Sequence, residues 1–376
     1  MLGMHVLITA RRRLVAGILA GAVVLAAGIF VAVWYTGNRL NDAIPQTDLF
    51  GTPTPVAGPA TPSTRPSPGG WDIKGPLNIL IAGEDTDPNE RGREFPHSDA
   101  VMILHLDATL THGYLVSLPR DQLVHVPANP VSGTGADYTK LTHAMTYGSR
   151  VPGSNKPNFA QGFALLARTV SAYTGIDHFD AGAIISFAGL VKLVDLLGGI
   201  DLYVDHKVTS IHMSPDGRNV YHSGPYMVYN VGPMHLNGWQ ALDYARQRYS
   251  LPNGTYDRER HHRQIIEALL ARVLSFDNLL RYPYLAPSLI AALSGMITVD
   301  LRGRSVQDYV YALRNLRPEN LTLVGLPGHG VYTNGQYRGE DLFPIQADYF
   351  KALRADTLDT FLAAHPELVN KDNQPY

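Results

Sequence analysis

The 376-residue chain contains no cysteine, and this absence excludes several kinds of chemistry. Without thiols there is no cysteine nucleophile, no thiolate zinc site and no disulfide bond. An exported protein that needs no disulfides fits this composition. The chain also lacks an excess of charge of either sign, because its 31 lysines and arginines and its 33 aspartates and glutamates leave a formal net charge of −2.

Several well-known catalytic motifs are missing as well. The sequence has no Walker loop, no dinucleotide-binding fingerprint, no His-Glu-x-x-His motif and no Gly-x-Ser-x-Gly elbow. The neighbouring His261 and His262 would diverge by about 100° on a helix, so they do not form a metal-binding pair. The sequence therefore argues against a zinc enzyme and against a serine hydrolase.

A membrane anchor is expected near the N-terminus. Three arginines, 11 to 13, precede an uncharged apolar stretch from Leu14 to Tyr35. At about 1.5 Å per residue this stretch can cross a hydrocarbon core of about 30 Å. The basic residues keep residues 1–13 in the cytoplasm, which predicts a single-pass membrane protein with its remainder outside. The alternative is a cleaved signal peptide, whose apolar region is usually about 7–15 residues long.

The rest of the chain divides into a linker, one large domain and a tail. Residues 36–76 are predicted to form an extracellular linker, because Pro, Thr, Ser and Gly dominate from Pro45 to Pro76. In an extended form it would hold the domain up to roughly 90 Å from the bilayer. Residues 77–363 can build one large core, and residues 364–376 are expected to be poorly ordered.

Three apolar runs predict strands that bring charged residues to one edge of a sheet. The runs are residues 77–82, 100–106 and 113–118. If successive strands alternate in direction, Asp85, Asp99, Arg120 and Asp121 all fall on the same edge. Helices are expected at 159–173 and 187–197, with a strand at 200–204, so the fold class is α/β.

Five arginines lie between Tyr244 and Arg263, which points to binding of a polyphosphate. Arginine forks fit phosphate bidentately and keep their charge. On extended backbone, Arg246 and Arg248 would present both forks on one face. Asp257 could cap the next helix and place Arg258 at its N-terminus, where anions are favoured. The alternative is a solvated basic surface with local salt bridges.

Asp85 and Asp99 are hard oxygen ligands of the kind that hold Mg²⁺ beside substrate phosphates. Their alternative role is to form turns and cap strands. Residues 1–13 are too few for a DNA-reading domain, so the arginines between Tyr244 and Arg263 are expected to meet their anion outside the membrane. This placement argues against nucleic acid as a partner.

An ordered set of motifs resembles the LytR-CpsA-Psr (LCP) family over about residues 77 to 330. They are Asn78–Asp85, His97–Asp99, Ser117–Asp121, Lys140–Ala144, Phe187–Gly199, Leu236–Leu242, Tyr244–Arg248 and Asp257–Arg258. The sequence departs from the family pattern in three places. His97 replaces an arginine, Glu84 replaces a serine, and His261-His262 replace part of an Arg-Gln-Gln motif.

The resemblance implies a three-layer α/β/α domain with a mixed central sheet, preceded by one transmembrane helix. It implies an enzyme that moves a glycan phosphate from a polyprenyl-pyrophosphate lipid, held in a tunnel, to peptidoglycan during cell-wall assembly. The polymer could be a teichoic acid or arabinogalactan. The residues that the resemblance places on the pyrophosphate are Arg120, Arg246, Arg248 and Arg258, with His97 and Arg260 as minor contacts.

By the same resemblance, Asp85 and Asp99 would hold Mg²⁺ or Mn²⁺. Asp121, beside Arg120, is a candidate base for the acceptor hydroxyl, with a structural ion pair as its alternative role. Two other functions stay open: a pyrophosphatase that uses water as acceptor, and a non-catalytic wall-binding or regulatory protein of the transcriptional-attenuator type.

Overall fold

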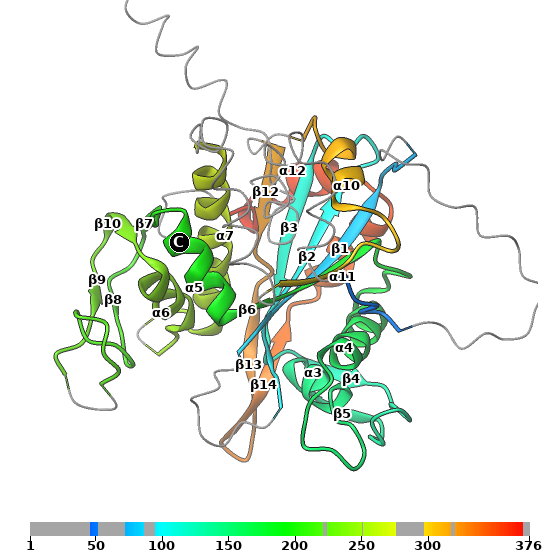
Figure 1. Ribbon diagram of the computed structural model, residues 1–376, viewed down its shortest axis with the longest axis horizontal. Helices are drawn as coiled ribbons and strands as arrows, with labels where there is room; N and C mark the ends of the chain where they lie inside the picture. Colours follow the sequence, from blue (N-terminus) through cyan, green and yellow to red (C-terminus); the bar gives the residue numbers. More distant parts are fainter. Residues whose placement is uncertain are drawn as a thin grey trace, which may run out of the picture.

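The centre of the molecule is a six-stranded mixed sheet, seen in the computed structural model (Figure 1). The structure describes residues 46–51, 72–85, 95–220, 224–249, 251–275, 297–316 and 320–370. The strand order is β11-β6-β1-β2-β3-β12. The bounds are β1 (Leu77–Glu84), β2 (Ser98–Leu106), β3 (Gly113–Leu118), β6 (Ala181–Ser186), β11 (Ile297–Asp300) and β12 (Leu321–Val324).

The first three strands alternate in direction, as the sequence predicted. β1 pairs antiparallel with β2, and β2 pairs antiparallel with β3. β6 runs parallel to β1 and β12 runs parallel to β3, which makes the sheet mixed. The C-terminal ends of β1, β3 and β6 and the N-terminal end of β2 therefore share one edge, which is called the functional edge below.

Helices cover both faces of the sheet, so the predicted three-layer α/β/α arrangement is confirmed. Ile79 and Ile81 of β1 pack in one hydrophobic cluster, and Leu80 and Ala82 pack in the other. Burial on both faces explains why these strands read as continuous apolar runs in the sequence. The first cluster contains residues of α5 (Phe187–Leu196), α6 (Gly238–Arg246), α7 (Thr255–Ser275) and α10 (Val306–Ala312). The second contains residues of α3 (Thr142–Gly148), α4 (Phe159–Thr174), α11 (Ile345–Arg354) and α12 (Leu358–Ala364).

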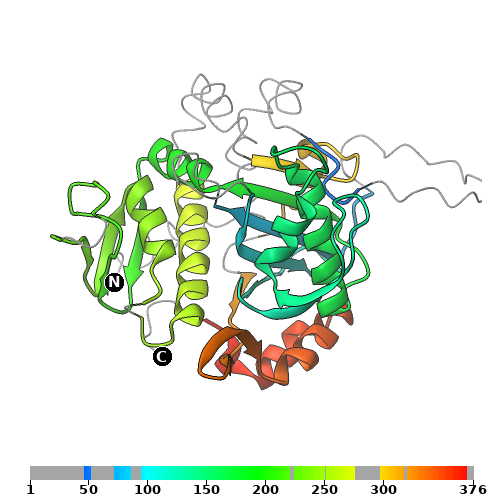
Figure 2. The ribbon, with the colours of Figure 1, turned by 90° about the horizontal axis from the view of Figure 1, so that it is seen from below.

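Four short strand pairs extend the core. They are β4 (Leu123–Val126) with β5 (Asp137–Lys140), β7 (Ile200–Val204) with β10 (Gly232–Leu236), β8 (Val208–Thr209) with β9 (Val228–Tyr229), and β13 (Gly328–Thr333) with β14 (Gln336–Leu342). Figure 2 shows α7 standing between the β7–β10 region and the central sheet. The helix predicted at 187–197 and the strand predicted at 200–204 are confirmed. Gly198 and Gly199, with φ of 75° and 92°, make the turn between them.

The two outer strands of the central sheet, β11 and β12, are covered by segments that were expected to belong to the linker and the tail. At β11, Gln46 forms a bridge with Val299, and Leu49 is fully buried. At β12, Val369 forms a bridge with Val324. It follows the 3-10 helix η2 (Pro366–Leu368), in which Leu368 is only 2% exposed.

The boundaries expected for the linker and the tail were therefore wrong for residues 46–51 and for residues 364–370, because apolar side chains anchor both segments. The transmembrane helix expected at 14–35 lies outside the described residues. Among the residues that the structure describes, no helix is long and apolar enough to span a bilayer.

Replacing Leu368 by Ala tests the docking of the tail. Leu368 is buried at the β12 edge, so we expect a loss of about 2 kcal/mol in the free energy of unfolding, at the low end for buried leucines. The neighbouring Glu367 has a side chain that is 62% exposed, and Glu367→Ala should change stability by less than about 0.5 kcal/mol. Denaturant unfolding measures both. Equal, small effects of the two substitutions would contradict the docked tail.

Candidate active site

A β-bulge shapes the functional edge. Gly83 lies opposite Ala100 and Glu84 lies opposite Ser98, so Asp99 is the extra residue on β2. Bulges re-aim side chains, and the Asp99 carboxylate forms an ion pair with Arg120, which follows β3. Asp85 follows β1 and is 3% exposed, and its carboxylate accepts the backbone N–H of His97 at 3.2 Å. The predicted meeting of the strand ends is thus confirmed for Asp99 and Arg120.

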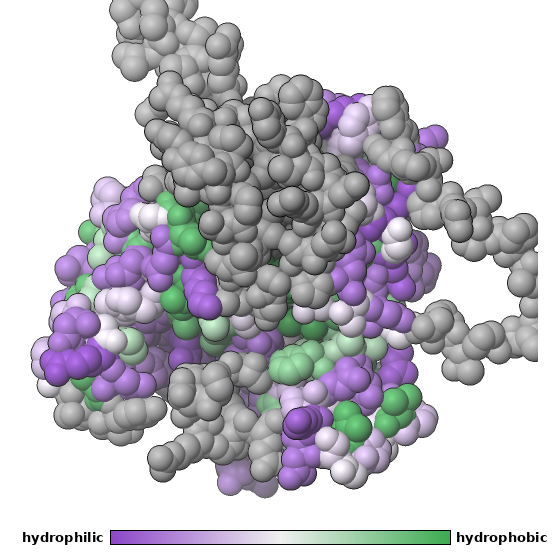
Figure 3. Space-filling view, in the orientation of Figure 1, coloured by the Kyte–Doolittle hydropathy of each residue, from purple (hydrophilic) through white to green (hydrophobic). Residues whose placement is uncertain are grey.

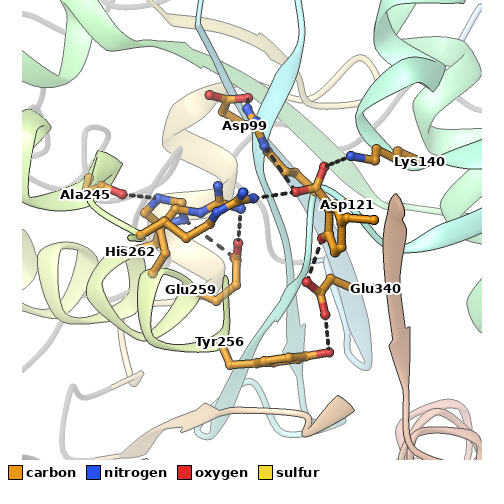
Figure 4. A network of polar contacts seen from close by, with 12 residues as sticks. Asp99, Asp121, Lys140, Ala245, Tyr256, Glu259, His262 and Glu340 are labelled. Atoms are coloured by element: carbon orange, nitrogen blue, oxygen red, sulfur yellow. Dashed lines mark hydrogen bonds and ion pairs between the residues drawn. The ribbon is translucent and has the colours of Figure 1, made fainter. Parts of the chain in front are cut away.

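The carboxylate of Asp121 sits among basic groups from distant parts of the chain (Figure 4). Lys140 Nζ lies 3.1 Å from one of its oxygens, and Arg248 Nη1 lies 3.0 Å from the other. Arg120 Nε is 3.9 Å away. The four basic residues Arg120, Lys140, Arg248 and Arg258 are called the basic cluster below.

The basic cluster keeps Asp121 ionised. Burial alone would raise the pKa of Asp121, but the charges of Arg120 and Lys140 outweigh it and hold this pKa below its ordinary value. A carboxylate so stabilised is a weak base. The geometry therefore favours the structural ion pair over the candidate base for Asp121.

Arg246 and Arg248 contact different surroundings. Arg246 is the last residue of α6, and the chain becomes extended at Gln247, so the expected extended backbone does not apply to Arg246. Its guanidinium carbon lies 5.8 Å from the ring centre of Phe187, the first residue of α5, whereas Arg248 reaches Asp121. A capping box formed by Asn237 and Gln240 begins α6.

Arg258 and Arg260 lie on different sides of α7. This helix begins at Thr255, so Asp257 falls inside its first turn instead of capping it. Arg258 pairs with Glu259 at 3.3 Å, and its charge contributes to the low pKa of Asp121.

Arg260 is 4% exposed and forms ion pairs with the buried Asp205 and Asp257. Side chains two positions apart on a helix point about 200° away from each other, which explains the separation of Arg260 from Arg258. The structure therefore assigns Arg260 to a buried ion-pair network, which corrects the expectation of a phosphate contact there.

Two residues of this region received no role from the sequence, namely Lys140 in the basic cluster and His143 beside it. Lys140 contacts Asp121, and its Nζ also lies 4.8 Å from the ring centre of Tyr337. His143, on α3, has a pKa lowered by burial and by the charge of Lys140, and its ring lies 6.4 Å from that of His97. Both belong to the motif Lys140–Ala144, which was the available signal.

An apolar cavity of about 80 Å³ opens between the sheet and the helices α5 and α7. Its apolar lining includes Ile81, Met102, Leu190, Leu193, Ile266 and Leu269. Phe187, Ser186 and His262 also line it, and Phe187 carries Arg246 on its ring. The cavity thus adjoins an arginine. Figure 3 shows hydrophobic residues at the surface where α5 lies.

A wider groove of about 530 Å³ lies beside Arg248. It is lined by the loop 252–256 and by the β13–β14 hairpin, including Tyr256, Tyr332 and Tyr337. The buried carboxylate of Glu340 accepts the hydroxyls of Tyr337 at 2.6 Å and Tyr256 at 3.1 Å, which fixes both rings (Figure 4). The groove offers aromatic faces and polar groups together.

The donor set at the functional edge suits a hard divalent cation that keeps part of its ligand shell for water and phosphate. Among the described residues, no group of three or more His, Asp or Glu side chains is placed to hold an ion. Asp85 and Asp99 supply two carboxylates at one edge. Mg²⁺ often takes one or two carboxylates and completes its shell with phosphate oxygens and water. The residues therefore fit Mg²⁺ that arrives with a phosphorylated substrate.

Comparison with known proteins agrees with this geometry. A model of the LytR_cpsA_psr family matches residues 56–351. The polyisoprenyl-teichoic acid–peptidoglycan teichoic acid transferase TagU of Enterococcus faecalis is 29% identical over 263 residues, which are 69% of this chain and 74% of that protein. The cell wall biosynthesis protein LcpA of Corynebacterium glutamicum is 25% identical over 76% of this chain, which spans only 56% of LcpA.

Among solved structures, protein gbs0355 of Streptococcus agalactiae has the same fold. Its TM-score is 0.58 at 23% identity, with 76% of this chain and 88% of that chain covered.

Replacing Arg258 or Arg260 by Met tests the division of roles on α7. Arg258→Met should weaken binding of inorganic pyrophosphate about 10- to 150-fold, because a charged hydrogen bond contributes about 1.5–3 kcal/mol. Arg260→Met should leave this affinity unchanged but cost about 3 kcal/mol in the free energy of unfolding, since it strands two buried carboxylates. Calorimetry on folded protein measures the affinity. Equal losses of affinity in both variants would return Arg260 to the phosphate site.

Proposed function

Because the chain belongs to the LytR-CpsA-Psr family, we propose that it is a membrane-anchored glycopolymer transferase of cell-wall assembly. It would move a glycan phosphate from a polyprenyl-pyrophosphate lipid to peptidoglycan. The observation that carries this proposal is the basic cluster, in which Arg120, Arg248 and Arg258 surround one carboxylate close to an apolar cavity.

The relatives support the reaction class. TagU of Enterococcus faecalis is by its name a transferase of teichoic acid to peptidoglycan, and LcpA is a cell wall biosynthesis protein. We extend this reaction class to the present chain, with a teichoic acid or arabinogalactan as the polymer. The anchor is the apolar stretch 14–35, which places the domain on the outer side of the membrane.

The cavity and the arginines suit the two halves of the donor lipid. The apolar lining between the sheet and α5 and α7 suits a prenyl chain, and Arg246 at Phe187 places a positive charge beside this lining. A volume of about 80 Å³ holds only the start of such a chain. Ligand pockets typically measure about 300–1,000 Å³, so α5 and α7 would move apart on binding.

The cluster would act by neutralising charge. The acceptor hydroxyl attacks the phosphorus next to the glycan, a new P–O bond forms to the acceptor, and the bond to the lipid phosphate breaks. Arg120 and Arg248 would stabilise the charge that develops on the leaving lipid phosphate, and the hydroxyl proton passes to solvent. When bound, Mg²⁺ or Mn²⁺ at Asp85 and Asp99 would supply further positive charge. Asp121 would position the cations instead of taking the proton.

The groove beside Arg248 is the place for the acceptor. Its tyrosines offer flat aromatic faces, and Glu340 and the loop 252–256 offer hydrogen-bonding groups. Sugar rings need this combination of apolar and polar contacts. The acceptor hydroxyl would then approach the basic cluster from the groove, opposite the lipid.

A transfer assay with Arg248 variants tests the proposal. Purified protein is given a lipid-linked glycan with and without peptidoglycan fragments, and the products are identified by mass spectrometry. Arg248→Ala should lower transfer at least about 100-fold, and Arg248→Lys should recover little, because Lys lacks the planar fork. Hydrolysis without peptidoglycan at the rate of transfer would instead support the pyrophosphatase. Full activity of the Lys variant would remove the role of the fork.

Asp99→Asn tests the metal. The arginines remain in this variant, so binding of the lipid should change less than about threefold while turnover falls at least about 30-fold. Chelation of divalent ions should lower the wild-type rate in the same way, and added Mg²⁺ should restore it. A variant that turns over normally, or a wild-type rate that ignores chelation, would exclude a metal at Asp99.

A further inference from the structure

The segment 46–51 is packed on the domain although it lies within the stretch that Pro, Thr, Ser and Gly dominate, Pro45 to Pro76. Thr47 donates its backbone N–H to Val299 of β11 at 3.0 Å, and Leu49 donates its own to the buried Asp300 carboxylate at 2.9 Å. Figure 1 shows the segment in dark blue beside α4. Residues 46–51 are called the clamp below.

The side chain of Phe50 also packs the clamp against the domain. The Phe50 ring lies 5.5 Å from that of Phe163 and 6.3 Å from that of Phe179. The guanidinium carbon of Arg302 lies over the Phe50 ring, 3.8 Å from its centre. Gly182 of β6 leaves room for the ring, since a Cβ atom there would come within 2.8 Å of it. The site is therefore built for Phe50.

The chain is held again at Asp72, near the end of the same stretch. Arg304 binds the Asp72 carboxylate through two hydrogen bonds of 2.7 Å. Both ends of the stretch 52–71 are thus attached to the domain, which makes this stretch a loop with respect to the domain. Only residues 36–45 separate the expected anchor from the clamp. Ten residues reach at most about 35 Å, far less than the full linker.

The clamp also fixes the side from which the chain enters. Gln46 pairs with Val299 in parallel, so the chain reaches Gln46 from the Ile297 end of β11. Ile297 lies opposite Ile185 of β6, next to Ser186 at the functional edge. Ile185 and Ser186 line the apolar cavity. The entry point of the chain is therefore on the side of the cavity.

We propose that the clamp ties the domain to the bilayer on a short tether, with the functional edge toward the lipid surface. The stretch 52–71 then does not set the distance from the membrane. This inference rests on the proposed anchor and lipid donor, and goes beyond them by naming the surface that meets the membrane. A long-chain lipid could then enter the cavity while its remainder stays in the bilayer.

Insertions at two positions test the tether. The chain has no cysteine, so a single Cys at Val131, which is 65% exposed, takes one fluorescent label. The full-length protein is placed in vesicles that carry a lipid-bound acceptor dye. A flexible insertion of about 20 residues after Asn41 lengthens the tether and should lower energy transfer. The same insertion after Thr61 enlarges only the loop and should leave energy transfer unchanged.

The outcomes separate the inference from the proposed function. Equal losses from both insertions would overturn the clamp while leaving the anchor in place. Wild-type protein that does not float with the vesicles would overturn the anchor and with it the tether. Leu49→Asp should release the clamp, so that the insertion after Thr61 then lowers energy transfer. Thr47→Ala is the matched control, because Thr47 is exposed and binds β11 through its backbone.

Activity gives a second measurement. Release of the clamp by Leu49→Asp makes the free tether between three and four times longer. Effective concentration falls as about the −3/2 power of length, so transfer from a vesicle-bound donor should fall about sevenfold. Transfer from a short-chain donor in solution should stay at the wild-type rate. An unchanged rate on the vesicle-bound donor would overturn the tether. An equal fall on both donors would also overturn it, because the clamp would then act on the active site and not on the distance from the membrane.

Discussion

The buried carboxylate of Asp121 is the interaction on which the candidate active site depends. It joins the end of β3, the end of β5 and the loop after α6, through Arg120, Lys140 and Arg248. Two like charges about 4 Å apart repel by about 4 kcal/mol in partly buried surroundings. Without a counter-charge these cations could not be gathered before the substrate arrives. In the proposed reaction, a pyrophosphate would then replace part of the negative charge that Asp121 supplies, at little cost in reorganisation.

The sequence predicted what local patterns determine. Strand periodicity predicted β1, β2 and β3, and their alternation brought Asp99 and Arg120 to one edge. The bulge at Asp99 could not be predicted, because it depends on how β1 and β2 align. The pairing of Asp121 with Arg248 joins residues 127 positions apart, which no local pattern encodes. Arg260 looked like Arg258 in sequence, and only the carboxylates of Asp205 and Asp257 distinguish them.

Two residues that depart from the family pattern, His261 and His262, make packing contacts in the structure. His261 is buried and stacks on Tyr244 with ring centres 4.0 Å apart, and burial lowers its pKa. His262 donates a ring N–H to the Ala245 carbonyl at 3.0 Å and lines the apolar cavity. One histidine thus supports α6 from the core, and the other shapes the wall that would meet the lipid. Substitution in this motif therefore changes packing more than charge.

The two segments that cover β11 and β12 affect how readily the chain aggregates before it is fully folded. An uncovered edge strand presents unpaired N–H and C=O groups that can recruit a strand from another molecule. Val299 on β11 and Val324 on β12 are each paired with a segment from near one end of the chain. In the order of the sequence, the segment 46–51 precedes β11, whereas Val369 follows β12. The β11 edge can therefore be covered as soon as β11 forms, whereas the β12 edge stays open to another molecule until Val369 has been made and docked.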